Sequence, residues 1–187
     1  MVKLNTSAPM FKTMALSEGA FKEISLEDYH GKFVVLFFYP ADFTFVCPTE
    51  LEDMADNYHK FQSMGVEILA ISTDSHFVHQ AWHDASKTIK KIKFPMLADT
   101  THEISNAYDV LRDNEGRADR ATIIIDPEGQ IKGIEITDEP VGRNADELIR
   151  KIGALEFARA NPGHVCPAKW EPGKQTLKPG IDLVGKI

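Results

Sequence analysis

The sequence predicts an α/β fold, and three observations support that prediction. Residues 33–39 and 66–72 are apolar runs rich in β-branched and aromatic side chains, which is typical of strands covered on both faces. Between them, residues 48–65 carry apolar side chains at helical spacing. Because a strand, a helix and a second strand in this order form a right-handed unit with parallel strands, we expect a βαβ unit here.

The next elements continue this order. The first helix begins at Pro48, a residue suited to the first helical position, and ends at Gly65. Residues 75–89 carry an apolar stripe at helical spacing, residues 94–98 indicate a short strand, and residues 103–108 indicate a short helix. The first half of the chain therefore alternates between strand and helix.

The second half predicts a hairpin and a long helix. Residues 120–126 and 131–137 are β-rich runs joined by the turn-rich residues 127–130. Residues 144–160 have the pattern of an amphipathic helix. A βαβ unit followed by a β-hairpin and a helix is the element order of the thioredoxin-like fold.

Composition divides the chain into two parts. We expect residues 1–160 to form the folded domain. Residues 161–187 contain four prolines and four glycines with little periodicity, so we expect them to form an extended C-terminal arm.

The net charge of −7 argues against a nonspecific nucleic-acid binder and against a protein held on anionic membranes by its charge. The longest uncharged apolar run, residues 33–41, has nine residues, whereas a membrane-spanning helix needs about 20. The first ten residues lack the apolar run of a signal peptide. We therefore expect a cytoplasmic protein that binds neither nucleic acid nor membrane.

The chain has two cysteines, Cys47 and Cys166, each between a valine and a proline. Two cysteines this far apart match neither a secreted disulfide framework nor a zinc site. Cys47 follows a strand and a loop and opens a helix, where the helix dipole favours a thiolate. Its position alone allows either a nucleophile or a small buried apolar side chain.

Cys166 lies in the predicted arm, and by itself it would be an incidental thiol. Beside a reactive Cys47 it becomes a candidate second thiol, because an arm can carry sulfur to an oxidised partner. A disulfide requires Cα atoms within about 7 Å, so the arm must move or another subunit must supply it. The sequence leaves both routes open.

Three histidines, His76, His79 and His83, share one helical face. Their spacing is compatible with a transition metal, but a solvated helix face is the simpler interpretation, and the HExxH signature is missing. We therefore predict no metal. No spacing of Cys47 with histidine and aspartate supports a hydrolase triad.

Two segments resemble a known family. Residues 40–50, PADFTFVCPTE, resemble the Pro-x-x-x-Thr-x-x-Cys active-site loop of peroxiredoxins, and residues 164–170, HVCPAKW, resemble their resolving-cysteine segment. The resemblance extends over essentially the whole chain and is greatest to the bacterial alkyl hydroperoxide reductase branch. It identifies the chain as a typical two-cysteine peroxiredoxin of thioredoxin-like fold.

The resemblance implies a thiol-dependent peroxidase for hydrogen peroxide and organic hydroperoxides. The Cys47 thiolate would attack the terminal peroxide oxygen and become a sulfenic acid, which Cys166 of the partner subunit would convert to a disulfide. Thr44, Arg120 and the first-turn amides would hold the peroxide and stabilise the leaving oxygen, and Pro40 would shield the thiolate. The resemblance implies no bound cofactor.

Three further residues have supporting roles in this resemblance. Glu50 and Arg143 would orient Arg120 or the loop, although Glu50 also fits as an ordinary acidic residue in a first helical turn. Trp82 would lie near the active loop or a subunit contact, although core packing alone explains its place on an apolar stripe.

The resemblance also implies partners. It predicts antiparallel homodimers that assemble into decamers, and an external electron donor, either an NADH-dependent flavoprotein disulfide reductase or thioredoxin. A holdase chaperone and a redox-relay sensor are the alternative functions. Residues 112–118 lack the Gly-Gly-Leu-Gly insertion of many eukaryotic relatives, and the chain lacks their C-terminal Tyr-Phe, so we predict resistance to hyperoxidation.

Overall fold

The computed structural model describes residues 2–186 and forms two compact units. One unit reaches Ala145, and the other begins at Asp146 and contains most of the last long helix. The sequence placed a domain boundary after residue 160, and that boundary stays a prediction.

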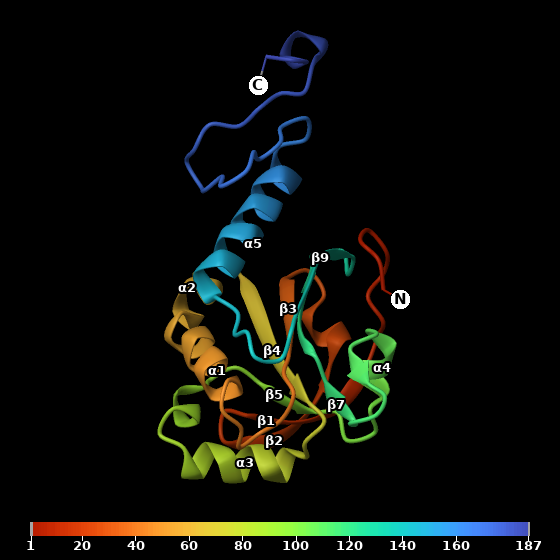
Figure 1. The fold of residues 1–187 in the computed structure, drawn as a ribbon, viewed down its shortest axis with the longest axis vertical. Coiled ribbons are helices and arrows are strands. Elements are labelled where there is room, and N and C mark those ends of the chain that lie inside the picture. The colour runs from red at the N-terminus through yellow and green to blue at the C-terminus, as the bar shows by residue number, and fades with distance from the viewer. Residues whose placement is uncertain (1, 187) are drawn as a thin grey trace. The chain divides into compact units, whose positions relative to one another are not determined.

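A seven-stranded mixed sheet forms the core of the first unit (Figure 1). Its strand order is β2-β1-β5-β4-β3-β8-β9. The strands are β1 (Lys12–Ser17), β2 (Ala20–Ser25), β3 (Phe33–Phe38), β4 (Val66–Ser72), β5 (Met96–Ala98), β8 (Arg120–Ile125) and β9 (Ile131–Thr137). β3, β4 and β5 are parallel, and the other neighbouring pairs are antiparallel. The predicted βαβ unit and the predicted hairpin are therefore confirmed.

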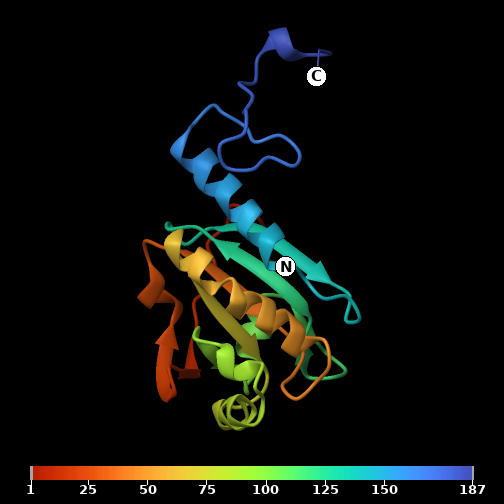
Figure 2. The ribbon, with the colours of Figure 1, turned by 90° about the vertical axis from the view of Figure 1, so that its left-hand side faces the viewer.

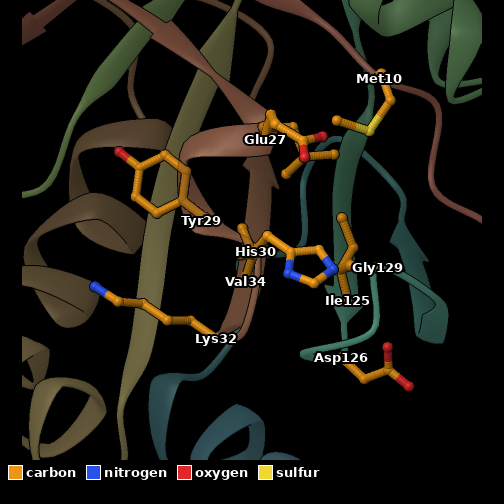
Figure 3. Close-up of a pocket in the computed structure, with 10 residues that line it drawn as sticks. Met10, Glu27, Tyr29, His30, Lys32, Val34, Ile125, Asp126 and Gly129 are labelled. Carbon is orange, nitrogen blue, oxygen red and sulfur yellow. The ribbon is translucent and has the colours of Figure 1, made fainter.

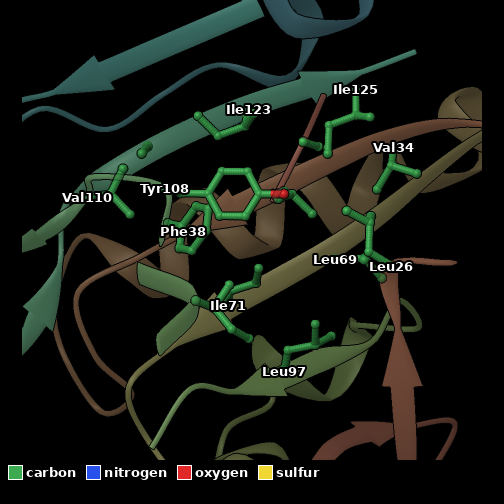
Figure 4. Packing of buried hydrophobic residues seen from close by; sticks show 14 of the residues in the cluster. Leu26, Val34, Phe38, Leu69, Ile71, Leu97, Tyr108, Val110, Ile123 and Ile125 are labelled. Atoms are coloured by element: carbon green, nitrogen blue, oxygen red, sulfur yellow. The ribbon is translucent and has the colours of Figure 1, made fainter. Parts of the chain in front are cut away.

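Helices cover both faces of this sheet. They are α1 (Cys47–Asp56), α2 (Tyr58–Ser63), α3 (His76–Ala85) and α4 (Glu103–Ala107), with short 3-10 turns η1 (Leu26–Tyr29) and η2 (Ile89–Lys91). α1 and α4 lie on opposite sides of the sheet, and the view in Figure 2 looks onto the side that α1 and α2 cover. The cluster under α4 includes Phe38, Ile71 and Tyr108, with the rings of Phe38 and Tyr108 centred 5.7 Å apart (Figure 4).

Some predicted elements differ from the structure. The helix expected over residues 48–65 is two helices, because Asn57 interrupts it and donates its side-chain amide to the carbonyl oxygen of Asp53. The helix expected over residues 75–89 ends at Ala85. The β1–β2 hairpin and the small hairpin β6 (Leu111–Arg112) and β7 (Arg117–Ala118) were not predicted.

The second unit contains α5 (Ala145–Ala160) from its second residue onward and the segment after it, with a 3-10 turn η3 (Ile181–Leu183). Part of this segment closes on itself, because Val165 and Leu177 form an antiparallel bridge. Trp170 is buried, and its ring lies 4.9 Å from that of Phe157 on α5. The segment that was expected to be extended is therefore locally folded around Cys166.

Candidate active site

The loop between β3 and α1 places Cys47 at the first position of a helix. β3 ends at Phe38, and α1 begins at Cys47 with Pro48 next. Cys47 is fully buried. Burial alone is compatible with both interpretations of this sulfur, so the groups around it decide between them.

A buried guanidinium contacts the sulfur of Cys47. Arg120 is the first residue of β8, and because β8 is antiparallel to β3, its start lies beside the end of β3. Arg120 Nη1 donates to Cys47 Sγ at 3.3 Å and to Glu50 Oε2 at 2.7 Å, and Arg120 Nε donates to the main-chain oxygen of Glu139 at 2.7 Å. A thiolate accepts such a charge-assisted hydrogen bond well, so this contact favours the nucleophile over the apolar interpretation.

Glu50 bridges two arginines. Its side chain, on the first turn of α1, is 1% exposed. Oε1 accepts from the main-chain N and the Nε of Arg143 at 2.9 and 2.8 Å, and Oε2 accepts from Arg120. Arg143 also donates to the main-chain oxygen of Ala121 at 2.7 Å, and its guanidinium lies 3.5 Å from the centre of the Phe37 ring. The structure thus brings Glu50, Arg143 and Arg120 together, and the supporting roles that the resemblance implies for Glu50 and Arg143 stay predictions.

The charges of this cluster balance only when the sulfur is ionised. Two guanidinium groups and one carboxylate give a formal charge of +1, which a Cys47 thiolate neutralises. Burial lowers the pKa of Arg143, and Glu50 opposes this effect. Burial also acts to lower the pKa of Arg120, but Cys47 and Glu50 outweigh it, and the pKa is raised. Both arginines stay charged, and Arg120 places a fixed positive charge beside the sulfur.

Thr44 and Pro40 lie on the loop that leads to Cys47. The Thr44 hydroxyl donates to the main-chain oxygen of Ala41 at 2.8 Å. Its oxygen therefore remains an acceptor for an incoming peroxide hydroxyl. Pro40 is buried in the same loop. Their roles toward a peroxide stay predictions.

Trp82 supports this loop from α3. It is 4% exposed, and the centre of its ring system lies 6.3 Å from the ring of Tyr39 and 5.9 Å from that of Phe43. Trp82 is therefore a core residue that also contacts the active loop, so the two interpretations of this residue are compatible.

One buried group near the loop was missed. His79 was assigned to a solvated helix face together with His76 and His83, and that assignment is wrong for His79, which is fully buried. Its Nδ1 is hydrogen-bonded to Oδ2 of Asp42, in the active loop, at 2.7 Å. The available signal was the position of His79 three residues before Trp82, on the apolar stripe of the helix.

Cys166 lies in the second unit. It is half-buried, and its Sγ lies 3.7 Å from the main-chain oxygen of Ala154 on α5. Arg150 of α5 donates to the main-chain oxygen of Trp170 at 3.0 Å, which fastens the chain that follows the cysteine. Both cysteines of the chain are free thiols.

A small pocket lies at the opposite end of β3 from Cys47 (Figure 3). It has a volume of about 50 Å³, and its lining includes Tyr29, Lys32 and Ile125. Burial is the main cause that raises the pKa of Tyr29 to about 12. Because the pocket flanks the start of the strand and Cys47 follows its end, the pocket is separate from the thiol site.

Within residues 2–186, no group of histidine, cysteine, aspartate or glutamate side chains is arranged to hold a metal ion. Over the same residues, none of the helices combines the length and the apolar character that crossing a bilayer requires.

The fold and the site together define a class of protein. A thiol at a helix start, held against a buried arginine on a thioredoxin-like sheet, is equipped for reaction with an electrophilic oxygen, as a thiol-dependent peroxidase requires. A model of the AhpC/TSA family matches residues 4–134, and a model of the C-terminal domain of 1-Cys peroxiredoxin matches residues 154–182. The chain belongs to the AhpC/TSA family and is a thiol-dependent peroxidase.

Individual relatives agree with this assignment. The chain is 52% identical to Alkyl hydroperoxide reductase C of Escherichia coli K12 over the full length of both, and 50% identical to that of Bacillus subtilis over 95% of both. A crystal structure of Enterococcus faecalis AhpC covers 89% of this chain and all of that chain, with a TM-score of 0.86 and 47% identity. A reduced 2-Cys peroxiredoxin of Plasmodium vivax gives a TM-score of 0.92 at 36% identity, over 97% of this chain and 96% of that chain. The predicted family and thioredoxin-like fold are thus confirmed.

Proposed function

We propose that Cys47 is the thiolate that reduces hydroperoxides in this chain. The contact of Arg120 Nη1 with both Cys47 Sγ and Glu50 carries this proposal, because it places a fixed cation beside the reacting sulfur. The sulfur attacks the terminal peroxide oxygen, the O–O bond breaks, and the alkoxide or hydroxide takes a proton to leave as alcohol or water. Cys47 becomes a sulfenic acid.

The surrounding residues prepare this step. Arg120 stabilises the charge that develops on the oxygens, and the Thr44 hydroxyl aligns the peroxide for in-line attack. Glu50 and Arg143 hold Arg120 in place, Pro40 shields the thiolate, and Trp82 packs against the loop.

Cys166 completes the cycle. Its thiol attacks the sulfenic sulfur of Cys47 in the partner subunit, a disulfide forms and water leaves. With both cysteines in the disulfide, two electrons must come from another molecule. The site needs no bound cofactor for these steps.

The proposal includes partners and location. As the resemblance implies, we propose a flavoprotein disulfide reductase as the electron donor, with thioredoxin as the alternative. A disulfide between subunits requires a homodimer, and we propose that dimers assemble into decamers. We propose a cytoplasmic location, because both cysteines are free thiols and the cytoplasm keeps thiols reduced.

The assignment of Cys47 and Cys166 is tested with Cys47→Ser and Cys166→Ser. We expect Cys47→Ser to abolish peroxide consumption, because a serine hydroxyl stays protonated and cannot accept the peroxide oxygen. After one equivalent of hydrogen peroxide, non-reducing electrophoresis should show a covalent dimer for the wild type and for neither variant. Peroxide consumption by Cys47→Ser would overturn the assignment, and an oxidised band of monomer size would contradict the arrangement between subunits.

We also expect resistance to hyperoxidation. A Cys166 that reaches the sulfenic acid quickly traps it before a second peroxide forms a sulfinic acid. Mass spectrometry of Cys47 after turnover at low peroxide excess should show little sulfinic acid in the wild type. Cys166→Ser is the matched control, because its sulfenic acid cannot be trapped and should overoxidise. Abundant sulfinic acid in the wild type would contradict the prediction.

A further inference from the structure

A buried chain of hydrogen bonds connects α3 with the middle of the active loop. His79 Nδ1 lies 2.7 Å from Asp42 Oδ2, and His79 Nε2 lies 3.1 Å from the main-chain oxygen of Leu97. The other carboxylate oxygen, Asp42 Oδ1, accepts from the Tyr39 hydroxyl at 2.7 Å. The side chains of His79 and Asp42 are both 0% exposed. These contacts hold the Asp42 side chain in place. In the sequence, Asp42 lies midway between Pro40 and Thr44.

The geometry requires one proton between His79 and Asp42. Because the oxygen of Leu97 is only an acceptor, His79 Nε2 must carry a hydrogen. The 2.7 Å contact at Nδ1 then needs a second hydrogen, held either by the imidazolium or by the carboxylic acid. If that proton leaves, a nitrogen lone pair faces a carboxylate oxygen in a buried place, which is strongly unfavourable.

The groups around the pair favour retention of this proton. Asp74 accepts a hydrogen bond from the main-chain N–H of Asp42 at 2.9 Å and another from the Ser72 hydroxyl at 2.8 Å. Burial raises the pKa of Asp42, His79 opposes this effect, and the charge of Asp74 adds to it. Burial also raises the pKa of Tyr39, so its hydroxyl remains a donor. On α3, the nearby ring of Trp82 packs on Tyr39 and contributes no charge.

The pair acts on residues that the proposed function uses. Asp42 is held through its side chain by His79 and through its main-chain N–H by Asp74. The next turn of the same loop carries the Thr44 hydroxyl, which bonds to Ala41. A shift at Asp42 therefore moves the group that aligns the peroxide.

We propose that His79 is a positioning residue for peroxide reduction, and that one proton shared with Asp42 locks the active loop. This inference rests on the proposed function of the loop. Loss of the shared proton opens the lock, and the rate of Cys47 oxidation falls.

Asp42→Asn distinguishes an effect of the shared proton from an effect of packing. The amide introduced by this change donates to neutral His79 Nδ1 and accepts from Tyr39, so both hydrogen bonds persist without a titrating proton. We measure the second-order rate constant for single-turnover oxidation of Cys47 by hydrogen peroxide, using rapid quenching and mass spectrometry. From neutral to alkaline pH, the wild-type constant should fall by on the order of tenfold or more, and that of Asp42→Asn should stay level. Equal alkaline decreases in the two proteins would overturn the inference.

Variants of His79 give a second readout. His79→Leu removes both hydrogen bonds and should lower the rate constant by on the order of 100-fold at neutral pH. His79→Asn restores a donor toward Asp42 and should recover part of that loss, while His83→Leu, on the same helix, should match the wild type. If His79→Leu does not fold, the pH profile of Asp42→Asn and the recovery in His79→Asn still decide. A His79→Leu rate equal to that of the wild type would overturn the inference.

Cys47→Ser distinguishes a failure of the proposed function from a failure of this inference alone. Peroxide reduction by Cys47→Ser would overturn the proposed function and the inference with it. An inactive Cys47→Ser together with equal alkaline decreases in wild type and Asp42→Asn would overturn the inference alone.

Discussion

Arg120→Met is expected to slow the reaction of Cys47 with hydrogen peroxide by on the order of 100- to 1,000-fold. The change removes the cation that lies 3.3 Å from the sulfur, while an unbranched apolar side chain still fills part of the space. Glu50 keeps its hydrogen bonds to Arg143, so the variant should fold. Single-turnover oxidation under stopped flow measures the effect directly.

Arg117→Met is the matched control for this prediction. Arg117 lies three residues earlier, its side chain is 36% exposed, and it pairs with the carboxylate of Glu139. Its loss should leave the oxidation rate within about twofold of the wild type, because surface ion pairs contribute little to the stability of the fold. An equal effect of the two substitutions would show that Arg120 acts through general charge and not through its contact with the sulfur.

Glu50→Ala is expected to lower the free energy of unfolding by about 3–5 kcal/mol. The carboxylate accepts hydrogen bonds from Arg120 and Arg143, whose side chains are 3% and 5% exposed, so its removal leaves two buried cations side by side. Urea unfolding of the reduced protein, at one fixed protein concentration, measures the change.

Glu52→Ala is the control on the same helix. Glu52 forms an exposed ion pair with Lys91, so its removal should lower the free energy of unfolding by about 1 kcal/mol or less. A loss below about 1 kcal/mol in Glu50→Ala as well would mean that solvent or main-chain groups already satisfy the two arginines.

The parts of the fold that carry a strong local pattern could be predicted from the sequence. β3 is apolar throughout and β4 is apolar apart from Glu67 and Ser72, because both strands are covered on two faces, and their residues follow the expected ranges closely. The break at Asn57 was not predictable from apolar periodicity, because the apolar stripe continues from α1 into α2. The β1–β2 hairpin turns at Glu18 and Gly19, both with positive φ, and its exposed residues give only a weak strand pattern.

The candidate site was predictable where family motifs name its residues. Cys47, Glu50, Arg120 and Arg143 are brought into one cluster, as the resemblance implied. The partner of His79 was not predictable, because Asp42 lies 37 residues away and only the tertiary fold brings the two together. Local spacing places His79 on the apolar stripe of α3, which is a signal of burial, but it does not identify Asp42.

The hydrogen bond from Arg120 to Glu139 has a consequence for variants of this site. The acceptor is a main-chain oxygen, so substitution of the Glu139 side chain does not remove it. The direction of the Arg120 guanidinium is thus encoded partly in the path of the backbone after β9. A scan of single side-chain substitutions would overlook this contact, whereas a one-residue deletion between residues 138 and 142 would displace the oxygen and turn the guanidinium away from the sulfur.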